Sequence, residues 1–170
     1  MKSNDNAASL ATLADFTSAK LIVPHLKSRK PSDVIKELCQ LLYQEGCVTD
    51  LAALTDAVFK RESMTTTAMD NDLALPHARI QGLKKFAMAF GRSDVPLTWV
   101  EQQEHRPVHL VFLMAVPEGD ATQHLQFISG VSRLYTSEAM LEKLRTAATA
   151  ADIFAIFKQV SLKKTESKKK

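Results

Sequence analysis

The chain has 170 residues, of which 45% are hydrophobic and 24% charged, and this composition is typical of one globular domain. The formal charge of +3 comes from the C-terminus, because residues 163–170 hold five lysines and one glutamate while the remaining chain has 17 basic and 18 acidic residues. A nucleic-acid-binding function is therefore not expected, since binding to duplex needs a basic stripe on the folded body. A membrane span is not expected either, because no apolar run approaches the roughly 20 residues required.

The cysteines and the N-terminus favour a cytoplasmic protein. Cys39 and Cys47 lie eight residues apart, and no second pair completes a zinc site, so buried thiols are favoured over a disulfide. The N-terminus lacks the apolar core of a signal peptide, because Asp5 and Asp15 interrupt it. We therefore expect the protein to act in the cytoplasm.

The two ends of the chain differ in composition from its middle. Residues 1–18 are rich in Ser, Ala, Thr and Asn, and we expect them to form a flexible leader. Residues 162–170 are predicted to form a disordered, lysine-rich tail. The folded domain is accordingly predicted to span residues 19–161.

The first half of this domain predicts one short strand and two helices. Pro24 interrupts the strand, which suits the edge of a sheet. The helices are indicated by apolar residues at helical spacing between a capping residue and a stop. The predicted ranges are 20–26 for the strand, Ser32 to Gly46 for the first helix and Thr49 or Asp50 to about Arg61 for the second.

The second half predicts three strands followed by three helices. The longest apolar run, VHLVFLMAV, is expected to be a central strand that is covered on both faces. Asp120 and Gln123 resemble a capping box at the start of the helix that follows. The strands are predicted at 86–90, 97–100 and 108–116, and the helices begin near Asp120, Ser137 and Thr149. This order predicts the α/β class, with a single mixed β-sheet flanked by helices on both faces.

Three side chains along this chain suit the chemistry of phosphate. His77 follows Leu73-Ala74-Leu75-Pro76 at the end of a short predicted strand, and Pro76 restricts the direction in which it emerges. His124 lies in the first turn of a helix, where unpaired N–H groups attract anions. Arg61 offers a guanidinium that can hold phosphate oxygens. An imidazole nucleophile with such donors, joined by the Thr67 hydroxyl, favours phosphoryl transfer.

Each of these residues also has a structural interpretation, and other chemistries remain open at this point. His77 and His124 taken singly are more often core or cap residues. A zinc site of His77, His109 and His124 has no supporting helical spacing, so we expect no metal. No glycine-rich phosphate loop or dinucleotide fingerprint is present, so ATP is not expected as a direct donor.

Two segments resemble a known family. The run RESMTTTAMDNDLALPHAR (61–79), followed by RPVHLVFLMAVPEGDATQHLQFISGVSRLY (106–135), is similar to the IIA domain of the phosphoenolpyruvate-dependent sugar phosphotransferase system. The resemblance is to the fructose/mannitol class, which includes the nitrogen-regulatory IIA proteins, and it covers residues 20–160. The matched positions are Arg61, Glu62, Thr67, Pro76, His77, His124 and Leu125.

This resemblance implies a site and its partners. It implies that His77 accepts a phosphoryl group on Nε2 from the phosphohistidine of the carrier HPr or its nitrogen-branch counterpart, while His124 and Arg61 steady the phosphoryl oxygens. It also implies a mixed-sheet α/β fold, no metal and no cofactor. The protein would then be a phosphohistidine carrier or regulator, and not an enzyme that turns over a small molecule.

One segment departs from the family pattern. The family has glycines between the threonine and the apolar run, whereas this chain has Ala68 to Asp72. Asn and Asp tolerate a positive φ better than most residues, so we expect the turn to form without glycine. The carboxylates of Asp70 and Asp72 are expected to repel an incoming phosphate if they face the site.

The resemblance leaves two functions open. The first is a sugar-transport component that passes phosphate from His77 to a separate EIIB domain. The second is a regulatory protein whose contacts with its targets depend on phosphorylation of His77. We favour the second, because the chain shows no EIIB-like cysteine domain and no membrane segment.

Overall fold

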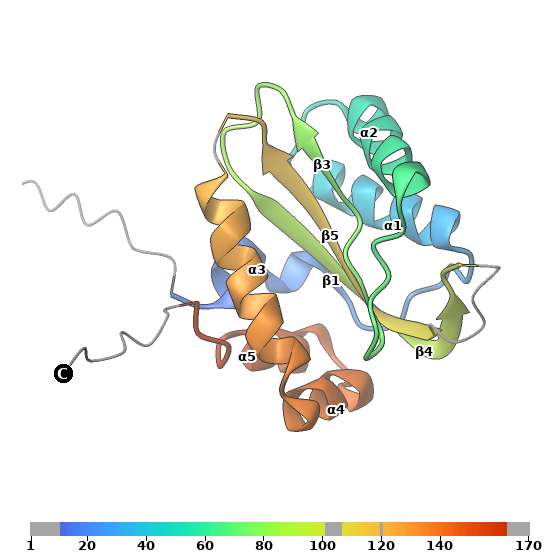
Figure 1. Cartoon of the computed structure of the whole chain (residues 1–170), viewed down its shortest axis with the longest axis vertical. Coiled ribbons are helices and arrows are strands. Elements are labelled where there is room, and N and C mark those ends of the chain that lie inside the picture. Colours follow the sequence, from blue (N-terminus) through green and yellow to red (C-terminus); the bar gives the residue numbers. More distant parts are fainter. Residues whose placement is uncertain (1–10, 101–106, 120, 163–170) are drawn as a thin grey trace, which may run out of the picture.

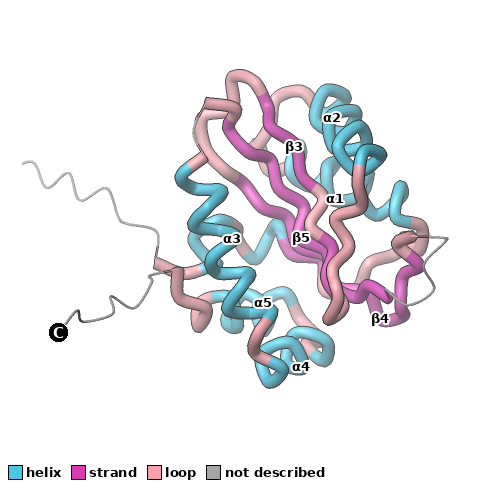
Figure 2. The backbone as a smooth tube through the Cα atoms, in the orientation of Figure 1, coloured by secondary structure: helices cyan, strands magenta, loops and turns pink. Residues whose placement is uncertain are grey.

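The computed structural model describes residues 11–100, 107–119 and 121–162. These residues form a five-stranded sheet between two layers of helices (Figures 1 and 2). The sheet is mixed, since β4 runs antiparallel to β5 and the other pairs are parallel. The predicted α/β fold, with one mixed sheet and helices on both faces, is therefore confirmed.

The sheet is built around β5, the strand predicted to be central. β4 pairs with one edge of β5, and β2 and β3 pair in succession with the other edge. β1 completes the sheet on the far side of β4. The strands are β1 (Ile22–Val23), β2 (Leu73–Ala74), β3 (His77–Ile80), β4 (Ala87–Thr98) and β5 (Pro107–Pro117).

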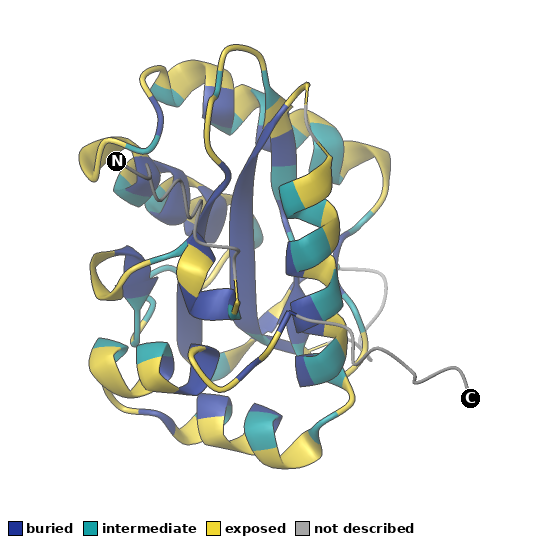
Figure 3. Cartoon of the chain, turned by 90° about the vertical axis from the view of Figure 1, so that its left-hand side faces the viewer, coloured by how far each residue is buried: buried dark blue, intermediate teal, exposed yellow. Residues whose placement is uncertain are grey.

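Alternating side chains of β5 divide the interior into two cores. Phe112 and Met114 pack on one face of the sheet, and Val111 and Leu113 pack on the other. All four are fully buried, and Figure 3 shows the middle of the sheet as buried. A central strand without charged side chains follows from this arrangement, because neither of its faces reaches water.

The helices cover the two faces unequally. On one face lie α1 (Pro31–Gln44) and α2 (Leu51–Met64), whose apolar sides pack against the sheet. The other face carries the C-terminal helices and the first of two short 3₁₀ helices from the N-terminus, while the second contributes Leu21 to the core beneath α1 and α2 (Figure 1). These are η1 (Leu13–Phe16), η2 (Ala19–Leu21), α3 (Thr122–Tyr135), α4 (Glu138–Thr146) and α5 (Ala150–Phe157).

Several helix ends follow the predicted capping residues. Asp50, Ser137 and Thr149 each accept a hydrogen bond from a backbone N–H in the first turn of their helix. Gly46 adopts φ 74° just after α1, as a stop residue should. The start of α1 differs from the prediction: Pro31 is its first residue, and Ser32 lies inside the first turn.

The two strands predicted at 86–90 and 97–100 are one strand. β4 runs through both, and its register against β5 shifts between Arg92 and Leu97. A bulge of this kind absorbs the intervening polar residues without ending the strand. Arg92 lies in this bulge with its side chain buried, and its guanidinium donates to the carbonyls of Pro24 and Arg145.

The predicted domain limits are too narrow at both ends. Leu13 and Phe16 are buried in the core, and the rings of Phe16 and Phe86 lie 5.0 Å apart. Residues 11–18 are therefore part of the packed domain and not of a flexible leader, because they cover the sheet edge beside α3 and α5. Leu162 is also buried, so the predicted tail begins too early. The rest of both predicted tails, 1–10 and 163–170, lies outside the described residues.

Two further expectations concern cysteines and membranes. Cys39 is buried, Cys47 is partly buried, and both are free thiols as predicted. Burial raises the pKa of the Cys39 thiol to about 11. Among the described helices, none is both long enough and apolar enough to cross a bilayer.

Candidate phosphoryl-transfer site

His77 is held in one tautomer by the chain just before it. The sequence places this histidine at the end of a strand, but the structure places it at the start of β3. Pro76 lies between β2 and β3 and separates the two strands. Its Nδ1 lies 2.8 Å from the carbonyl oxygen of Leu75. A carbonyl only accepts, so Nδ1 carries the hydrogen and Nε2 carries the free lone pair. His77 therefore has its nucleophilic nitrogen at Nε2.

His124 lies beside His77, although 47 residues separate them in the sequence. It is the third residue of α3, and the centroids of the two imidazole rings are 5.4 Å apart. The preceding residue fixes this end of the helix, because the side chain of Gln123 accepts a hydrogen bond from Phe86 N at 3.0 Å. The predicted role of Gln123 was that of a capping-box residue. The structure gives it a contact with Phe86, the residue just before β4, and Asp120 lies outside the described residues.

The environment of His124 favours its neutral form. Desolvation lowers its pKa below the ordinary value of 6.5, and the nearby charges of His77 and Arg79 lower it further. At neutral pH the ring consequently has one N–H donor and one lone pair. Such a ring still offers one N–H that can donate a hydrogen bond to a phosphoryl oxygen.

The two histidines open into a pocket of about 390 Å³. Arg61 lines it from the C-terminal half of α2, and its Nη1 donates to the carbonyl of Thr65 at 3.0 Å. The structure thus brings together Arg61, His77 and His124, three residues that the sequence singled out. No carboxylate lines this pocket among the described residues, so its electrostatic potential favours an anion. The lining consists of Ala57, Lys60, Arg61, Met64, His77, Ala78, Arg79 and His124.

Two cations of this pocket were missed by the sequence analysis. Arg79 follows His77 by two residues in β3, and side chains two apart lie on the same face of a strand. Period-two spacing would have identified Arg79 if the strand had been predicted to start at His77. Lys60 precedes Arg61 in α2 and lines the same pocket.

Thr67 was expected to donate to phosphate, but its hydroxyl has another partner. Its Oγ1 donates to Glu62 Oε2 at 2.7 Å, the side chain is buried, and Thr67 does not line the pocket. Glu62 also accepts from Thr67 N and from Trp99 Nε1, both at 2.9 Å. Glu62 therefore ties the end of α2 to the loop that follows it. The Arg61-Glu62 pair in the sequence did not predict this role.

The glycine-free turn forms as expected. Asn71 and Asp72 adopt φ values of 59° and 82°, so these residue types supply the left-handed backbone where the family has glycine. The Asp72 carboxylate binds His109 Nδ1 at 2.6 Å and Arg145 Nε at 2.9 Å. Asp72 precedes β2, which pairs with β5 at Leu110, whereas His77 pairs with β5 farther along, at Met114. The negative charge of Asp72 is already paired with His109 and Arg145. The repulsion expected from Asp72 is therefore absent.

The zinc alternative has no support in the described part of the chain. No group of three histidine, cysteine or carboxylate side chains there is arranged to hold a metal ion. His109 lies in the Asp72 cluster and does not line the pocket of His77 and His124.

A model of the EIIA 2 family of the phosphoenolpyruvate-dependent sugar phosphotransferase system matches residues 15–160. The chain is 29% identical to a nitrogen regulatory protein of Bradyrhizobium diazoefficiens, over 85% of this chain and 93% of that protein. It is 32% identical to the fructose-specific EIIABC component of Bacillus subtilis, over 86% of this chain but only 23% of that longer protein.

The fold is also similar to solved structures. The nitrogen regulatory protein IIA-Ntr of Neisseria meningitidis superposes with a TM-score of 0.76 at 25% identity, covering 85% of this chain and 98% of that one. The IIA mannitol protein of Escherichia coli has the same fold, with a TM-score of 0.70 at 20% identity, over 82% of this chain and 97% of that one. The match of the family model over most of the chain shows that this protein belongs to the EIIA 2 family of the phosphoenolpyruvate-dependent sugar phosphotransferase system.

Proposed function

We propose that His77 accepts a phosphoryl group on Nε2 from the phosphohistidine of an HPr-like carrier protein. The Nε2 lone pair forms the new N–P bond as the donor's N–P bond breaks, and the bonding electrons return to the donor imidazole. The Nδ1 hydrogen remains on His77 throughout, held by the Leu75 carbonyl. The transfer then needs no proton movement on His77, no metal and no diffusible cofactor.

The observation that carries this proposal is the Nδ1 contact to the Leu75 carbonyl, together with the cations around the ring. The hydrogen bond presents His77 as a neutral nucleophile in the required tautomer. Arg61, Arg79 and His124 line the same pocket as His77, and they would stabilise the equatorial oxygens of the transferring phosphoryl group. Thr67 would act only indirectly, because its hydrogen bond to Glu62 holds the loop after α2 in place.

The test is phosphorylation with purified components. The protein is incubated with phosphoenolpyruvate, enzyme I and the HPr-like carrier, and the acid-labile adduct is mapped by mass spectrometry. We expect one phosphoryl group on His77, and none when the carrier is omitted. An adduct on His124 or His109 would overturn the assignment.

We further propose that the phosphorylated and unphosphorylated forms regulate target proteins, as a nitrogen-type IIA protein would. The similarity to nitrogen regulatory proteins over nearly their whole length supports this function. The phosphoryl donor implies a cytoplasmic site of action, and the two free thiols agree with it.

Sugar transport is the second candidate, and the relatives support it as well. The fructose-specific EIIA component of Haloferax volcanii is 30% identical over 94% of its length. The mannitol IIA protein of Escherichia coli has been solved in complex with phosphorylated IIB. The experiment that separates the two functions is discharge of the phosphorylated protein onto each EIIB domain of the same cell. Transfer to one of them at a rate comparable with carrier-dependent loading would favour transport, and absence of transfer to all would favour regulation.

A further inference from the structure

A groove extends from the His77 pocket along one side of α2. It consists of two adjoining pockets that share Ala57 and Arg79: the His77 pocket, and a second of about 790 Å³ between the start of α2 and the turn from β3 to β4. We call this surface the α2 groove. The second pocket is lined by Cys47, Val48, Thr49, Asp50, Ala53, Ala57, Arg79, Ile80, Gln81, Gly82, Leu83, Lys84 and Lys85.

The charge of the α2 groove is almost entirely positive. Its cations come from α2, from β3 and from the turn after it: Lys60, Arg61, Arg79, Lys84 and Lys85. Within the described part of the chain, none of these five forms an ion pair, in contrast to Arg92 and Arg145. The one carboxylate of the lining, Asp50, accepts from Ala53 N at the start of α2. The groove therefore carries unbalanced positive charge on a body whose net charge is close to zero.

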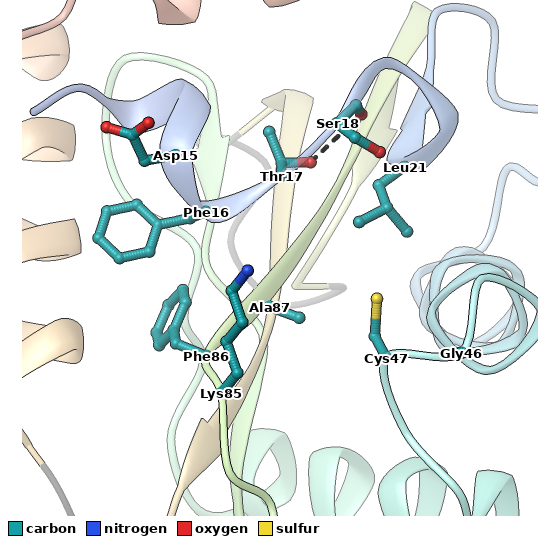
Figure 4. Close-up of a pocket in the computed structure, with 10 residues that line it drawn as sticks. All are labelled: Asp15, Phe16, Thr17, Ser18, Leu21, Gly46, Cys47, Lys85, Phe86 and Ala87. Carbon is teal, nitrogen blue, oxygen red and sulfur yellow. Dashed lines mark hydrogen bonds between the residues drawn. The ribbon is translucent and has the colours of Figure 1, made fainter. Parts of the chain in front are cut away.

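The far end of the groove adjoins an apolar pocket. Cys47 and Lys85 also line this third pocket, of about 350 Å³. In Figure 4 the Lys85 ammonium and the Cys47 sulfur point into the space bordered by Phe16, Leu21 and Phe86. A ligand with both negative charge and an apolar group fits this sequence of pockets, because the cations lie along the groove and a pocket floored by core side chains lies at its end. The one carboxylate of that pocket, Asp15, accepts from the backbone N–H groups of Ala11 and Thr12.

We propose that the α2 groove binds an acidic polypeptide segment of a protein partner, with carboxylates along the cations and a large apolar side chain in the pocket of Phe16, Leu21 and Phe86. The walls between the cations are the small and aliphatic side chains of Ala53, Ala57 and Leu83. Such walls suit a polypeptide better than single-stranded nucleic acid, which binds by stacking its bases on exposed aromatic rings.

This inference goes beyond the proposed function, because it needs no phosphoryl group on His77. It does place the partner next to that residue, since the two pockets share Arg79. The binding surface and the phosphoryl acceptor can therefore be tested separately.

The test uses the full, unphosphorylated chain and a fluorescent peptide that is rich in glutamate and has one central phenylalanine. We expect the peptide to bind and its amide-shift footprint to fall on residues 53–57 and 79–86. We expect Lys84→Glu to weaken binding roughly fivefold, since the loss is that of an exposed charge pair and its replacement by repulsion. The matched control is Lys143→Glu, which makes the same charge change on exposed α4, and it should leave binding within twofold.

Three outcomes would overturn the proposal. The first is equal weakening by the two substitutions, because binding would then follow net charge alone. The second is equal affinity for a peptide with glutamine in place of glutamate. The third is tighter binding of a DNA oligonucleotide of the same charge to the same residues. Lys84→Ala serves as a second variant, with an expected smaller loss in the same direction. Peptide binding is measured without carrier or phosphoenolpyruvate, so failure of the phosphorylation test leaves this test intact.

Discussion

Two histidine clusters lie along β5, and they differ in what holds the imidazole. In the first, His77 faces His124 and a pocket lined by Lys60, Arg61 and Arg79, and its Nδ1 donates to a backbone carbonyl. In the second, His109 binds the Asp72 carboxylate, and Arg145 binds the other oxygen of the same carboxylate. β3 pairs with β5 at Met114 and β2 pairs at Leu110, so the clusters are separated along the strand.

The group bonded to a histidine decides its role here more than the position of the histidine in a strand does. A carbonyl partner fixes the tautomer and adds no charge, so the cations of the His77 pocket remain available to an anion. A carboxylate partner neutralises the cations around His109 and ties the 68–72 turn to β5 and α4. The first arrangement suits group transfer, and the second stabilises the fold.

Replacing His77 should affect only phosphorylation, and replacing His109 should affect only stability. His77→Ala should abolish carrier-dependent phosphorylation, because the variant lacks the proposed nucleophile, Nε2 of His77. His109→Ala should keep phosphorylation and lose stability. The measurement is acid-labile phosphate per chain after incubation with phosphoenolpyruvate, enzyme I and the carrier. Retained labelling in His77→Ala would remove the proposed distinction.

Arg61 should contribute to the rate of phosphorylation and hardly at all to the stability of the fold. Arg61→Ala should slow carrier-dependent phosphorylation by roughly ten- to a hundredfold, since a donor to the transition-state oxygens is lost. Arg61→Lys should lie between this variant and the wild type, because lysine keeps the charge but loses the planar fork and the contact to the Thr65 carbonyl. Single-turnover rates at saturating carrier measure the effect. Equal rates for all three proteins would mean that Arg61 only supports the loop at Thr65 and does not contact the phosphoryl group.

Asp72 should contribute to stability and hardly at all to rate. Asp72→Asn keeps a residue that tolerates the positive φ but removes the charge between His109 and Arg145, so we expect a loss of about 2 kcal/mol in the free energy of unfolding. Urea titration at neutral pH measures this loss, and Asp56→Asn on the exposed side of α2 is the control. A phosphorylation rate reduced more than about threefold would show that the clusters are coupled.

The smallest effect is the pH dependence that His124 contributes. Its pKa is lowered in the folded protein, so between the folded and unfolded values the unfolded chain binds a proton that the folded chain does not. Stability is therefore lost as the pH falls below about 6.5. His124→Gln should reduce the difference in unfolding free energy between pH 7.5 and pH 5.5. An unchanged difference would mean that other groups account for it.

Strong local signals in the sequence identified residues that the fold brings together. The Pro-His pair, the first-turn histidine and the arginine at the end of α2 all lie around one pocket. The predictions failed where a partner distant in sequence decides the outcome. Thr67 donates to Glu62 and does not line the pocket, Gln123 accepts from the residue just before β4, and Leu13 is buried because α3 and α5 cover it.

Apolar periodicity and residue chemistry are local properties, so the class of fold and the central strand could be predicted from the sequence, and His77 could be proposed from it as the nucleophile. Only the tertiary structure decided which charges remain free. Asp72 and Arg145 are 73 residues apart, and their ion pair removes a carboxylate that the sequence had set against phosphate. Arg79 and Lys60 join the pocket because β3 lies against α2. Electrostatics in a folded chain depend on such contacts between segments that are distant in the sequence.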